Sequence, residues 1–227
     1  MDKRIFFIIR ATLAFFLLMQ LLTSCTSHSQ TLSSSISSIH IIDRNGLTET
    51  VSSKDRLKQY DHKNFLQPQP FQKVTRTYKR DSQGNIPSII TSYHPNGQPK
   101  QYLEALNSRA KGTYREWYLN GTCKLEASVI GGIADISTSA EESWLFDDRS
   151  RAWNEEGNLL ATITYAKGIL QGSSLYNHSN GELWKDIPYE NNEIHGNAYT
   201  YTDSGTLLLQ SQYHKGKKNG LSQRFWE

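Results

Sequence analysis

Cysteine and net charge are both scarce in this 227-residue chain. Its two cysteines, Cys25 and Cys123, cannot form a disulfide framework, so packing must hold the fold together. The formal net charge is only +3. The residues Asp2, Lys3, Arg4 and Arg10 contribute +2 of that charge, which leaves the remainder close to neutral. A nearly neutral chain lacks the basic surface that nucleic-acid binding requires.

Patterns that would indicate catalysis or metal binding are also missing. The seven histidines are dispersed, with no cysteine or carboxylate at metal-ligand spacing around them. His94 and His178 each precede a turn glycine by three residues, which indicates a structural position. The pair Asp147-Asp148 has no evident partner for acid–base chemistry, and Cys123 lacks a neighbouring base that would activate a nucleophile. We therefore expect no enzyme activity, no metal and no cofactor.

The N-terminal segment has the organisation of an export signal. Lys3 and Arg4 are followed by an apolar stretch from Ile5 to Leu22 and then by small polar residues. A transmembrane helix is the alternative, because roughly 18 to 20 apolar residues span a bilayer. Arg10 interrupts the stretch only in part.

The residues that follow favour export. Leu22-Thr23-Ser24-Cys25 resembles the lipobox of bacterial lipoproteins, in which a peptidase cuts before a cysteine that carries a diacylglycerol. The resemblance implies a signal peptide at residues 1–24, lipidation of Cys25, and no disulfide for Cys123. Each buried acyl methylene contributes about 0.8 kcal/mol, so two or three chains anchor stably. We expect a protein of the bacterial cell envelope, on the outward side of the inner membrane or on the outer membrane.

Two segments separate this cysteine from the main domain. Residues 25–38 are rich in Ser and Thr, which is typical of a flexible tether. Residues 39–72 are predicted to form an N-terminal hairpin and a connector. The hairpin strands, Ile39–Asp43 and Leu47–Val51, flank Asn45-Gly46. This pair favours a two-residue turn in which both residues take positive φ.

The connector is predicted to contain one short helix. Ser53 to Tyr60 has helical character, with Ser52 or Ser53 as the N-cap. The prolines of Gln67-Pro68-Gln69-Pro70 then exclude regular structure.

An internal repeat organises residues 73–227. Turn glycines recur 24 residues apart, with one interval of 36, at Gly97, Gly121, Gly157, Gly181 and Gly205. An aromatic residue stands four positions before four of these five glycines, and a second glycine stands fifteen positions after four of them. A lone hairpin is marginal in water, so neighbouring units must pair edge to edge. The repeat predicts an all-β fold, an elongated antiparallel meander of β-hairpin repeats with its aromatics in the sheet core.

Two of the units carry a family resemblance. Trp117–Thr122 and Tyr213–Gly220 resemble the MORN-variant repeat of YwqK-type antitoxins, and the resemblance extends over roughly residues 93–226. It implies a MORN-like solenoid, here in a lipoprotein form, and a protein that neutralises a partner toxin by direct binding. The matching residues are turn glycines and packing aromatics, so the resemblance is more specific for fold than for function.

The long interval contains a twelve-residue insertion within residues 133–151. It is acidic, and it carries Trp144 and Phe146 beside Asp147 and Asp148. Insertions in repeat proteins commonly lie on one face and contact partners, so these four residues are candidate partner-binding residues. The alternative is a loop that packs Trp144 and Phe146 back onto the sheet.

The C-terminal segment is a second candidate surface. Counting from Gly220, the next turn glycine would fall beyond Glu227, so the stretch Leu221–Trp226 is either an edge strand or part of a shortened array. Phe225 and Trp226 on an uncapped edge are candidates for pairing with another chain.

The function that these patterns favour is binding rather than chemistry. We expect a non-enzymatic, membrane-anchored lipoprotein that uses its repeats as a binding or scaffolding module for a protein or another envelope component. An antitoxin-like protein that neutralises a partner toxin is the alternative. An envelope hydrolase is the third possibility, and the sequence offers no cluster of acid, base and nucleophile for it.

Overall fold

The computed structural model describes residues 36–226. The predicted signal peptide at residues 1–24, Cys25 and most of the predicted tether therefore lie outside the described residues. Within residues 36–226, no helix combines the length and the apolar character needed to cross a membrane.

Strands dominate the described chain, and helices are few and short. The helical elements are α2 (Lys54–Leu57), η1 (Lys58–Tyr60) and α3 (Thr138–Glu141). The strands are β1 (Ile36–Asp43), β2 (Thr48–Val51), β3 (Gln72–Lys79), β4 (Pro87–Tyr93), β5 (Pro99–Leu106), β6 (Arg109–Trp117), β7 (Cys123–Gly131), β8 (Leu145–Trp153), β9 (Leu159–Ala166), β10 (Ile169–Leu170), β11 (Gly172–Asn177), β12 (Leu183–Glu190), β13 (Glu193–Ile194), β14 (Gly196–Tyr201), β15 (Leu207–His214) and β16 (Lys217–Arg224).

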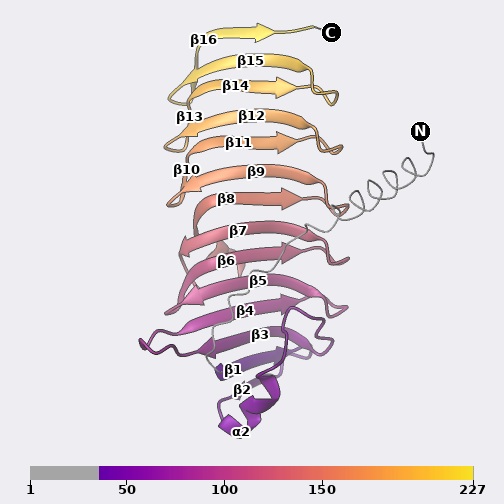
Figure 1. Ribbon diagram of the computed structural model, residues 1–227, viewed down its shortest axis with the longest axis vertical. Helices are drawn as coiled ribbons and strands as arrows, with labels where there is room; N and C mark the ends of the chain where they lie inside the picture. Colours follow the sequence, from indigo (N-terminus) through magenta and orange to yellow (C-terminus); the bar gives the residue numbers. More distant parts are fainter. Residues whose placement is uncertain (1–35, 227) are drawn as a thin grey trace, which may run out of the picture. The chain divides into compact units, whose positions relative to one another are not determined.

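All of these strands belong to one open antiparallel sheet, which confirms the predicted all-β meander of hairpin repeats. From β3 to β16 the strands lie in sequence order, one above the other, as Figure 1 shows. The short strands β10 and β13 extend the pairing of β9 and β12. At the other end, β1 lies between β3 and β2, so the N-terminal hairpin joins the same sheet as the repeats.

The predicted turn glycines lie in turns at one end of the strands. At each of the five, the glycine N–H donates to the carbonyl three residues earlier, for example from Gly121 to Tyr118 at 3.0 Å. The asparagine of an Asn-Gly pair then links neighbouring turns, because Asn96 Nδ2 donates to the carbonyl of Leu119 at 3.0 Å. His94 Nε2 lies 2.8 Å from the carbonyl oxygen of Trp117, which gives this histidine a structural contact between units.

The expected conformation of the Asn-Gly turn is wrong. Gly46 has a φ of 84°, but Asn45 is not among the described residues with positive φ. Asp43 explains the difference: its carboxylate accepts from the N–H groups of Asn45 and Leu47, both at 2.8 Å. A longer loop with a single left-handed glycine results, which is the three-residue hairpin geometry.

Two successive positive-φ residues occur instead at the opposite ends of the strands. Asn107 and Ser108 have φ values of 51° and 63°, and the flanking residues Leu106 and Arg109 pair directly. Lys167-Gly168, Asn191-Asn192 and Lys215-Gly216 repeat this conformation. The second glycines, fifteen positions after the turn glycines, are needed for a different reason. Gly112 has a φ of 127°, and a Cβ there would lie 2.4 Å from the carboxylate of Glu104.

Three predicted element boundaries differ from the structure. The first strand begins at Ile36 rather than at residue 39, because Ser38 already pairs with Tyr78 of β3. The predicted helix is split into α2 and η1, and its N-cap Ser53 makes no side-chain capping hydrogen bond. The segment 133–151 is not entirely a loop, because it contains α3 and all of β8 except its last two residues.

The strand register defines two faces of the sheet. Ile90, Leu103 and Tyr114 lie side by side on β4, β5 and β6, and we call this side the tyrosine face. The same row continues through Arg76 to His40 of β1. Side chains alternate along a strand, so Ile39 and Ile41, on either side of His40, point to the opposite face.

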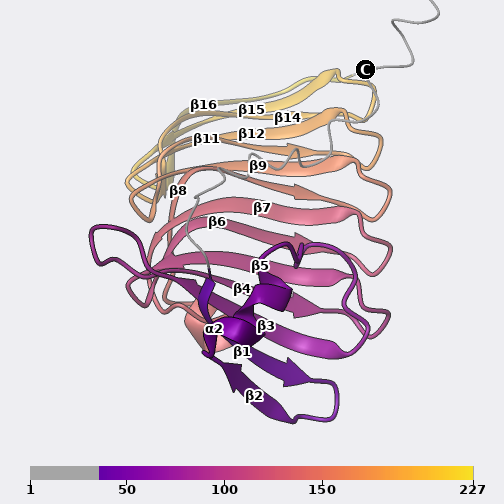
Figure 2. The ribbon, with the colours of Figure 1, turned by 60° about the horizontal axis from the view of Figure 1, so that its bottom comes forward.

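Each face of the sheet has one hydrophobic cluster, and a different segment of the chain packs over each cluster. On the opposite face, Ile39, Ile41, Val51 and Leu57 form a buried cluster, with Tyr60 and Phe65 packed against it. Figure 2 shows α2 and the connector in front of the first strands on this side. The cluster on the tyrosine face is formed by Ile90, Leu103, Ala110, Tyr114, Val129 and Trp144. Its cover is the insertion, which supplies Trp144.

Candidate binding surface

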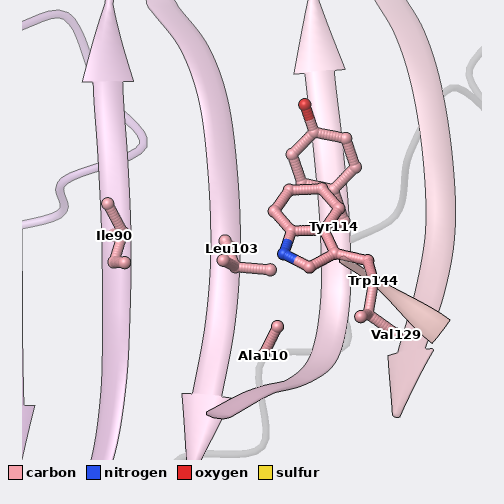
Figure 3. Close-up of a cluster of buried hydrophobic side chains, with 6 residues drawn as sticks. All are labelled: Ile90, Leu103, Ala110, Tyr114, Val129 and Trp144. Atoms are coloured by element: carbon pink, nitrogen blue, oxygen red, sulfur yellow. The ribbon is translucent and has the colours of Figure 1, made fainter. Parts of the chain in front are cut away.

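The insertion packs back onto the sheet through Trp144. The indole ring lies edge-on to Tyr114 with the ring centroids 4.6 Å apart, and only 6% of Trp144 is exposed. Figure 3 shows the indole over the Tyr114 ring, beside Leu103 and Ala110. Trp144 Nε1 donates to the carbonyl of Ile133 at 2.8 Å, so the polar atom of the indole is also satisfied.

Polar contacts hold the rest of the insertion in place. Glu141 of α3 accepts from Gln101 Nε2 at 2.9 Å and lies 3.3 Å from the Tyr114 hydroxyl. Arg76 and Asp135 form an ion pair at 3.0 Å. Burial, followed by the nearby carboxylate of Glu116, raises the pKa of Glu141 above its ordinary value. Burial and the hydrogen bond to Glu116 also raise the pKa of Tyr114, so its hydroxyl stays protonated.

The other three candidate residues from the insertion differ in how far they contact the rest of the protein. Phe146 is half-buried and packs against the same cluster as Trp144. Asp147 Oδ1 accepts from the N–H of Lys167 at 2.8 Å, so this carboxylate fixes a turn. Asp148 is exposed and has a φ of 59°. The structure thus brings Trp144 and Phe146 together over the protein's own core, and it leaves Asp148 on the surface.

An aromatic row continues from the insertion into the second half of the sheet. The centroids of Trp144 and Phe146 are 6.4 Å apart, and those of Phe146 and Tyr165 are 5.4 Å apart. The register then places Tyr189 and Tyr213 on the same face, opposite Gly172 and Gly196 respectively. The sequence pattern contained this row, since these tyrosines all stand eight positions after a turn glycine, but it did not show that they lack a cover.

No segment of the described chain covers the row beyond Phe146. Every buried hydrophobic side chain in residues 36–226 lies at or before Trp144. Along β9 and β12 the residues are half-buried or exposed. The buried residues after Trp144 are three serines, Ser150, Ser174 and Ser211, which lie on the tyrosine face between the larger side chains.

The uncovered row consists of aromatic and aliphatic residues without charge, and Lys185 lies beside it, two residues before Ile187 on β12. Ile163 and Ile187 lie on the same face as the tyrosines, next to Tyr165 and Tyr189 along β9 and β12. Partial burial raises the pKa of Tyr165 and of Tyr189, so both hydroxyls are neutral at physiological pH. We call Ile163, Tyr165, Ile187, Tyr189 and Tyr213 the open row.

The C-terminal candidates lie elsewhere in the sheet. Phe225 and Trp226 follow β16 and are 38% and 80% exposed. The Phe225 N–H donates to the carbonyl of Leu208 at 3.0 Å, and the Arg224 guanidinium lies 4.8 Å from the centroid of the Trp226 ring. All eight residues of β16 are exposed.

Three observations concern the histidine, cysteine and carboxylate side chains of the described residues. In residues 36–226 no group of three or more His, Cys, Asp and Glu side chains could hold a metal ion. Cys123 is buried and its Sγ lies 3.7 Å from the carbonyl oxygen of Leu125. The rings of His195 and His214 are in contact at an interplanar angle of 60°, with centroids 4.8 Å apart, and His195 Nδ1 lies 3.4 Å from Glu190.

Comparisons with known proteins add no assignment. No protein-family model matches the chain, and a search of curated proteins finds no relative. The resemblance to MORN-variant repeats therefore rests on the repeat residues themselves.

Proposed function

We propose that this protein is a non-enzymatic lipoprotein of the bacterial envelope that binds a partner protein on the open row. Lipidation of Cys25 would hold the repeat domain at a membrane, and the sheet would present the row to the partner. The partner segment that fits is uncharged and carries an aromatic or branched aliphatic side chain. The same proposal includes membership of the MORN-variant, YwqK-type repeat family.

The observation that supports this proposal is the contrast within one face. In the first half, the insertion lays Trp144 across Tyr114 and buries the row. In the second half, the same face continues with Tyr165 and Tyr189 and has no cover in the described chain. The insertion is thus an internal example of the segment that the open row accepts. An aromatic pair contributes about 0.5 to 1.5 kcal/mol beyond the area that it buries.

A site-specific photo-crosslinking experiment tests this proposal. The crosslinking residue replaces Tyr189 on the tyrosine face or, as the matched control, Tyr199, which is half-buried on the opposite face. The full chain is expressed in bacteria, irradiated, and separated into membrane and soluble fractions. We expect one protease-sensitive adduct from position 189 and none from position 199.

Two further variants separate the parts of the proposal. Tyr189→Lys introduces a charge into the open row and should abolish an adduct formed from position 213, whereas Tyr199→Lys should leave it. Cys25→Ala should abolish the labelling of the protein by radioactive palmitate. Equal adducts from both faces, or a protease-resistant lipid adduct, would contradict protein binding on the row. Palmitate labelling that survives Cys25→Ala would contradict the lipid anchor.

The adduct also distinguishes the antitoxin alternative. A partner that is toxic to cells unless this protein is present would identify the binding as neutralisation. Because a neutralising protein must share a compartment with its toxin, an exported antitoxin requires an exported toxin. A non-toxic envelope protein in the adduct would assign the module to scaffolding.

A further inference from the structure

The opposite face of the sheet has an open hollow over β6, β7 and β8. Its volume is about 390 Å³, and its polar lining comes from Thr113, Arg115, Glu126, Ser128, Asp148, Arg149 and Arg151. The three strands that carry it are neighbours in the middle of the sheet (Figure 1). We call this site the arginine hollow.

The strand register explains how three arginines reach one hollow. Arg115 of β6 pairs with Glu126 of β7, which pairs with Arg151 of β8, so these three side chains form one row. Arg149 stands two residues before Arg151 on β8 and therefore points to the same face. The hydroxyl residues Thr113 and Ser128, which pair with each other, lie next to it.

Positive charge exceeds what the neighbouring carboxylates neutralise. Glu126 is engaged by Arg115, whose Nε lies 2.7 Å from Oε2, while Arg151 is 4.0 Å from the other oxygen. Arg149 is exposed and has no ion pair with any described residue. With Asp148 at the rim, the lining contains three guanidinium groups and two carboxylates. The guanidinium group of Arg149, which has no ion pair, and that of Arg151, whose ion pair is long, can therefore donate hydrogen bonds to an anion.

The repeat itself does not require these arginines. Six positions before the successive turn glycines stand Thr91, Arg115, Arg151, Leu175 and Tyr199. Eight positions before them stand Ile89, Thr113, Arg149, Ser173 and Asn197. Since the other units fold with apolar or neutral residues at these positions, the three arginines depart from the repeat only where the hollow lies. A structural requirement of the sheet therefore does not explain them.

We propose that the arginine hollow binds a phosphate group carried on a small organic moiety. Guanidinium groups donate in a planar fork that matches phosphate oxygens, and the hydroxyls of Thr113 and Ser128 add neutral donors. The hollow is open and has a volume of about 390 Å³, so it has room for part of the sugar or glycerol attached to the phosphate. This site lies on the face opposite the open row, and the proposal does not depend on partner binding there.

The phosphate can belong to a soluble compound or to a lipid headgroup, and the experiment has one arm for each. Both arms use the predicted mature chain, residues 25–227, with Cys25→Ser, so that neither the apolar stretch from Ile5 to Leu22 nor acylation can attach the protein to a membrane. In the first arm, glycerol 3-phosphate is titrated calorimetrically, with glycerol as the uncharged probe. In the second arm, the protein is mixed with vesicles of phosphatidylcholine alone or with phosphatidic acid added.

Arg149→Gln removes the guanidinium group that has no ion pair, and Arg109→Gln is the matched control. Both side chains are exposed, and Arg109 does not line the hollow. We expect Arg149→Gln to weaken binding about tenfold, the value of one charged hydrogen bond, and Arg109→Gln to leave it unchanged. Circular dichroism of both variants confirms that the sheet is intact. Binding should also weaken as salt is raised.

Each outcome decides the proposal. Loss of glycerol 3-phosphate binding in Arg149→Gln alone assigns a soluble phosphorylated ligand. Binding only to phosphatidic acid vesicles, with the same dependence on Arg149, assigns a lipid headgroup. Absence of binding in both arms, or equal loss in the Arg149 and Arg109 variants, would overturn the proposal. None of these results depends on the crosslinking of Tyr189.

Discussion

The two halves of the sheet share one repeat and differ in what covers them. From β1 to β8, the connector packs on one face and the insertion on the other, and every buried hydrophobic residue of the described chain lies in the part up to Trp144. From β9 to β16, the same turns and the same ladder continue, but every residue except Ser174 and Ser211 is half-buried or exposed. The repeat therefore determines the sheet, whereas the segments that interrupt the repeat determine the core.

This difference separates two sources of stability. Backbone hydrogen bonds and nearest-neighbour contacts serve both halves, as in other stacked repeats. Only the first half adds complete burial of large apolar side chains, which contributes about 1.5 to 3 kcal/mol for each. We expect the second half to open more readily in hydrogen exchange, and such a surface is also the one free to bind.

The largest expected effect is the loss of a cover. Trp144→Ala removes a side chain that is only 6% exposed and packs on Tyr114. We expect it to lower the free energy of unfolding by about 3 to 5 kcal/mol. Trp184→Ala is the matched change in the second half, where the side chain is 39% exposed and lies under Lys185. We expect a cost of about 1 kcal/mol or less there. Urea unfolding of the full chain in detergent measures both.

Equal losses of unfolding free energy in Trp144→Ala and Trp184→Ala would contradict the difference between the two halves of the sheet. Hydrogen exchange localises the effect, because Trp144→Ala should raise exchange in β4 to β7 and leave β12 to β15 unchanged. A uniform rise over the whole sheet would mean that the two halves unfold as one unit.

The sequence predicted the sheet well because the repeat is local. The spacing of Gly97, Gly121, Gly157, Gly181 and Gly205 fixes the turns, and turn geometry fixes strand pairing. The same reasoning assigned the wrong conformation to Asn45-Gly46. Asn-Gly alone favours a two-residue turn, and the carboxylate of Asp43 selects a longer one. The side-chain acceptor stands two residues before Asn45, so the sequence does contain the signal for the longer loop.

The candidate surfaces were less predictable because they depend on tertiary contacts. Sequence analysis left open whether Trp144 faces a partner or the sheet, since burial of an aromatic side chain is favourable in either case. The open row consists of regularly spaced tyrosines, which the repeat presented as core. Their exposure follows from the absence of a second insertion in the described chain, and periodicity alone does not show it. The arginine hollow could have been found by comparing equivalent positions of the repeats.

A smaller effect distinguishes the serines of the two halves. Ser92 is 7% exposed, and its hydroxyl donates to Gln101 Oε1 at 3.0 Å. Ser174 is fully buried, and its Oγ has no hydrogen-bond partner among the described residues. Ser92→Ala should cost about 1 kcal/mol, whereas Ser174→Ala should be neutral or stabilise by up to about 1 kcal/mol. Thermal unfolding compares them directly. A clear loss of stability in Ser174→Ala would show that its hydroxyl has a partner, such as water.

The smallest effect is a pH dependence confined to the covered half. The pKa of Glu141 is raised above its ordinary value of 4.5, first by burial and then by Glu116. Just above pH 4.5 the folded chain therefore retains a proton that the unfolded chain has lost. The contribution of Glu141 to stability is therefore full below that pH and is lost as the pH rises through the raised pKa. Lys124, which pairs with Glu116 at 3.0 Å, moderates the fall.

Glu141→Gln should remove this fall, because an amide keeps an acceptor for Gln101 and carries no charge. The measurement is the urea midpoint between pH 4 and pH 7, with Glu193→Gln as the control because Glu193 is exposed in the open half. We expect the wild type and the control to lose stability over this range relative to Glu141→Gln, by less than about 1 kcal/mol. Identical profiles for all three proteins would mean that the insertion stays packed without regard to the charge on Glu141, and that apolar contacts of Trp144 alone hold the cover.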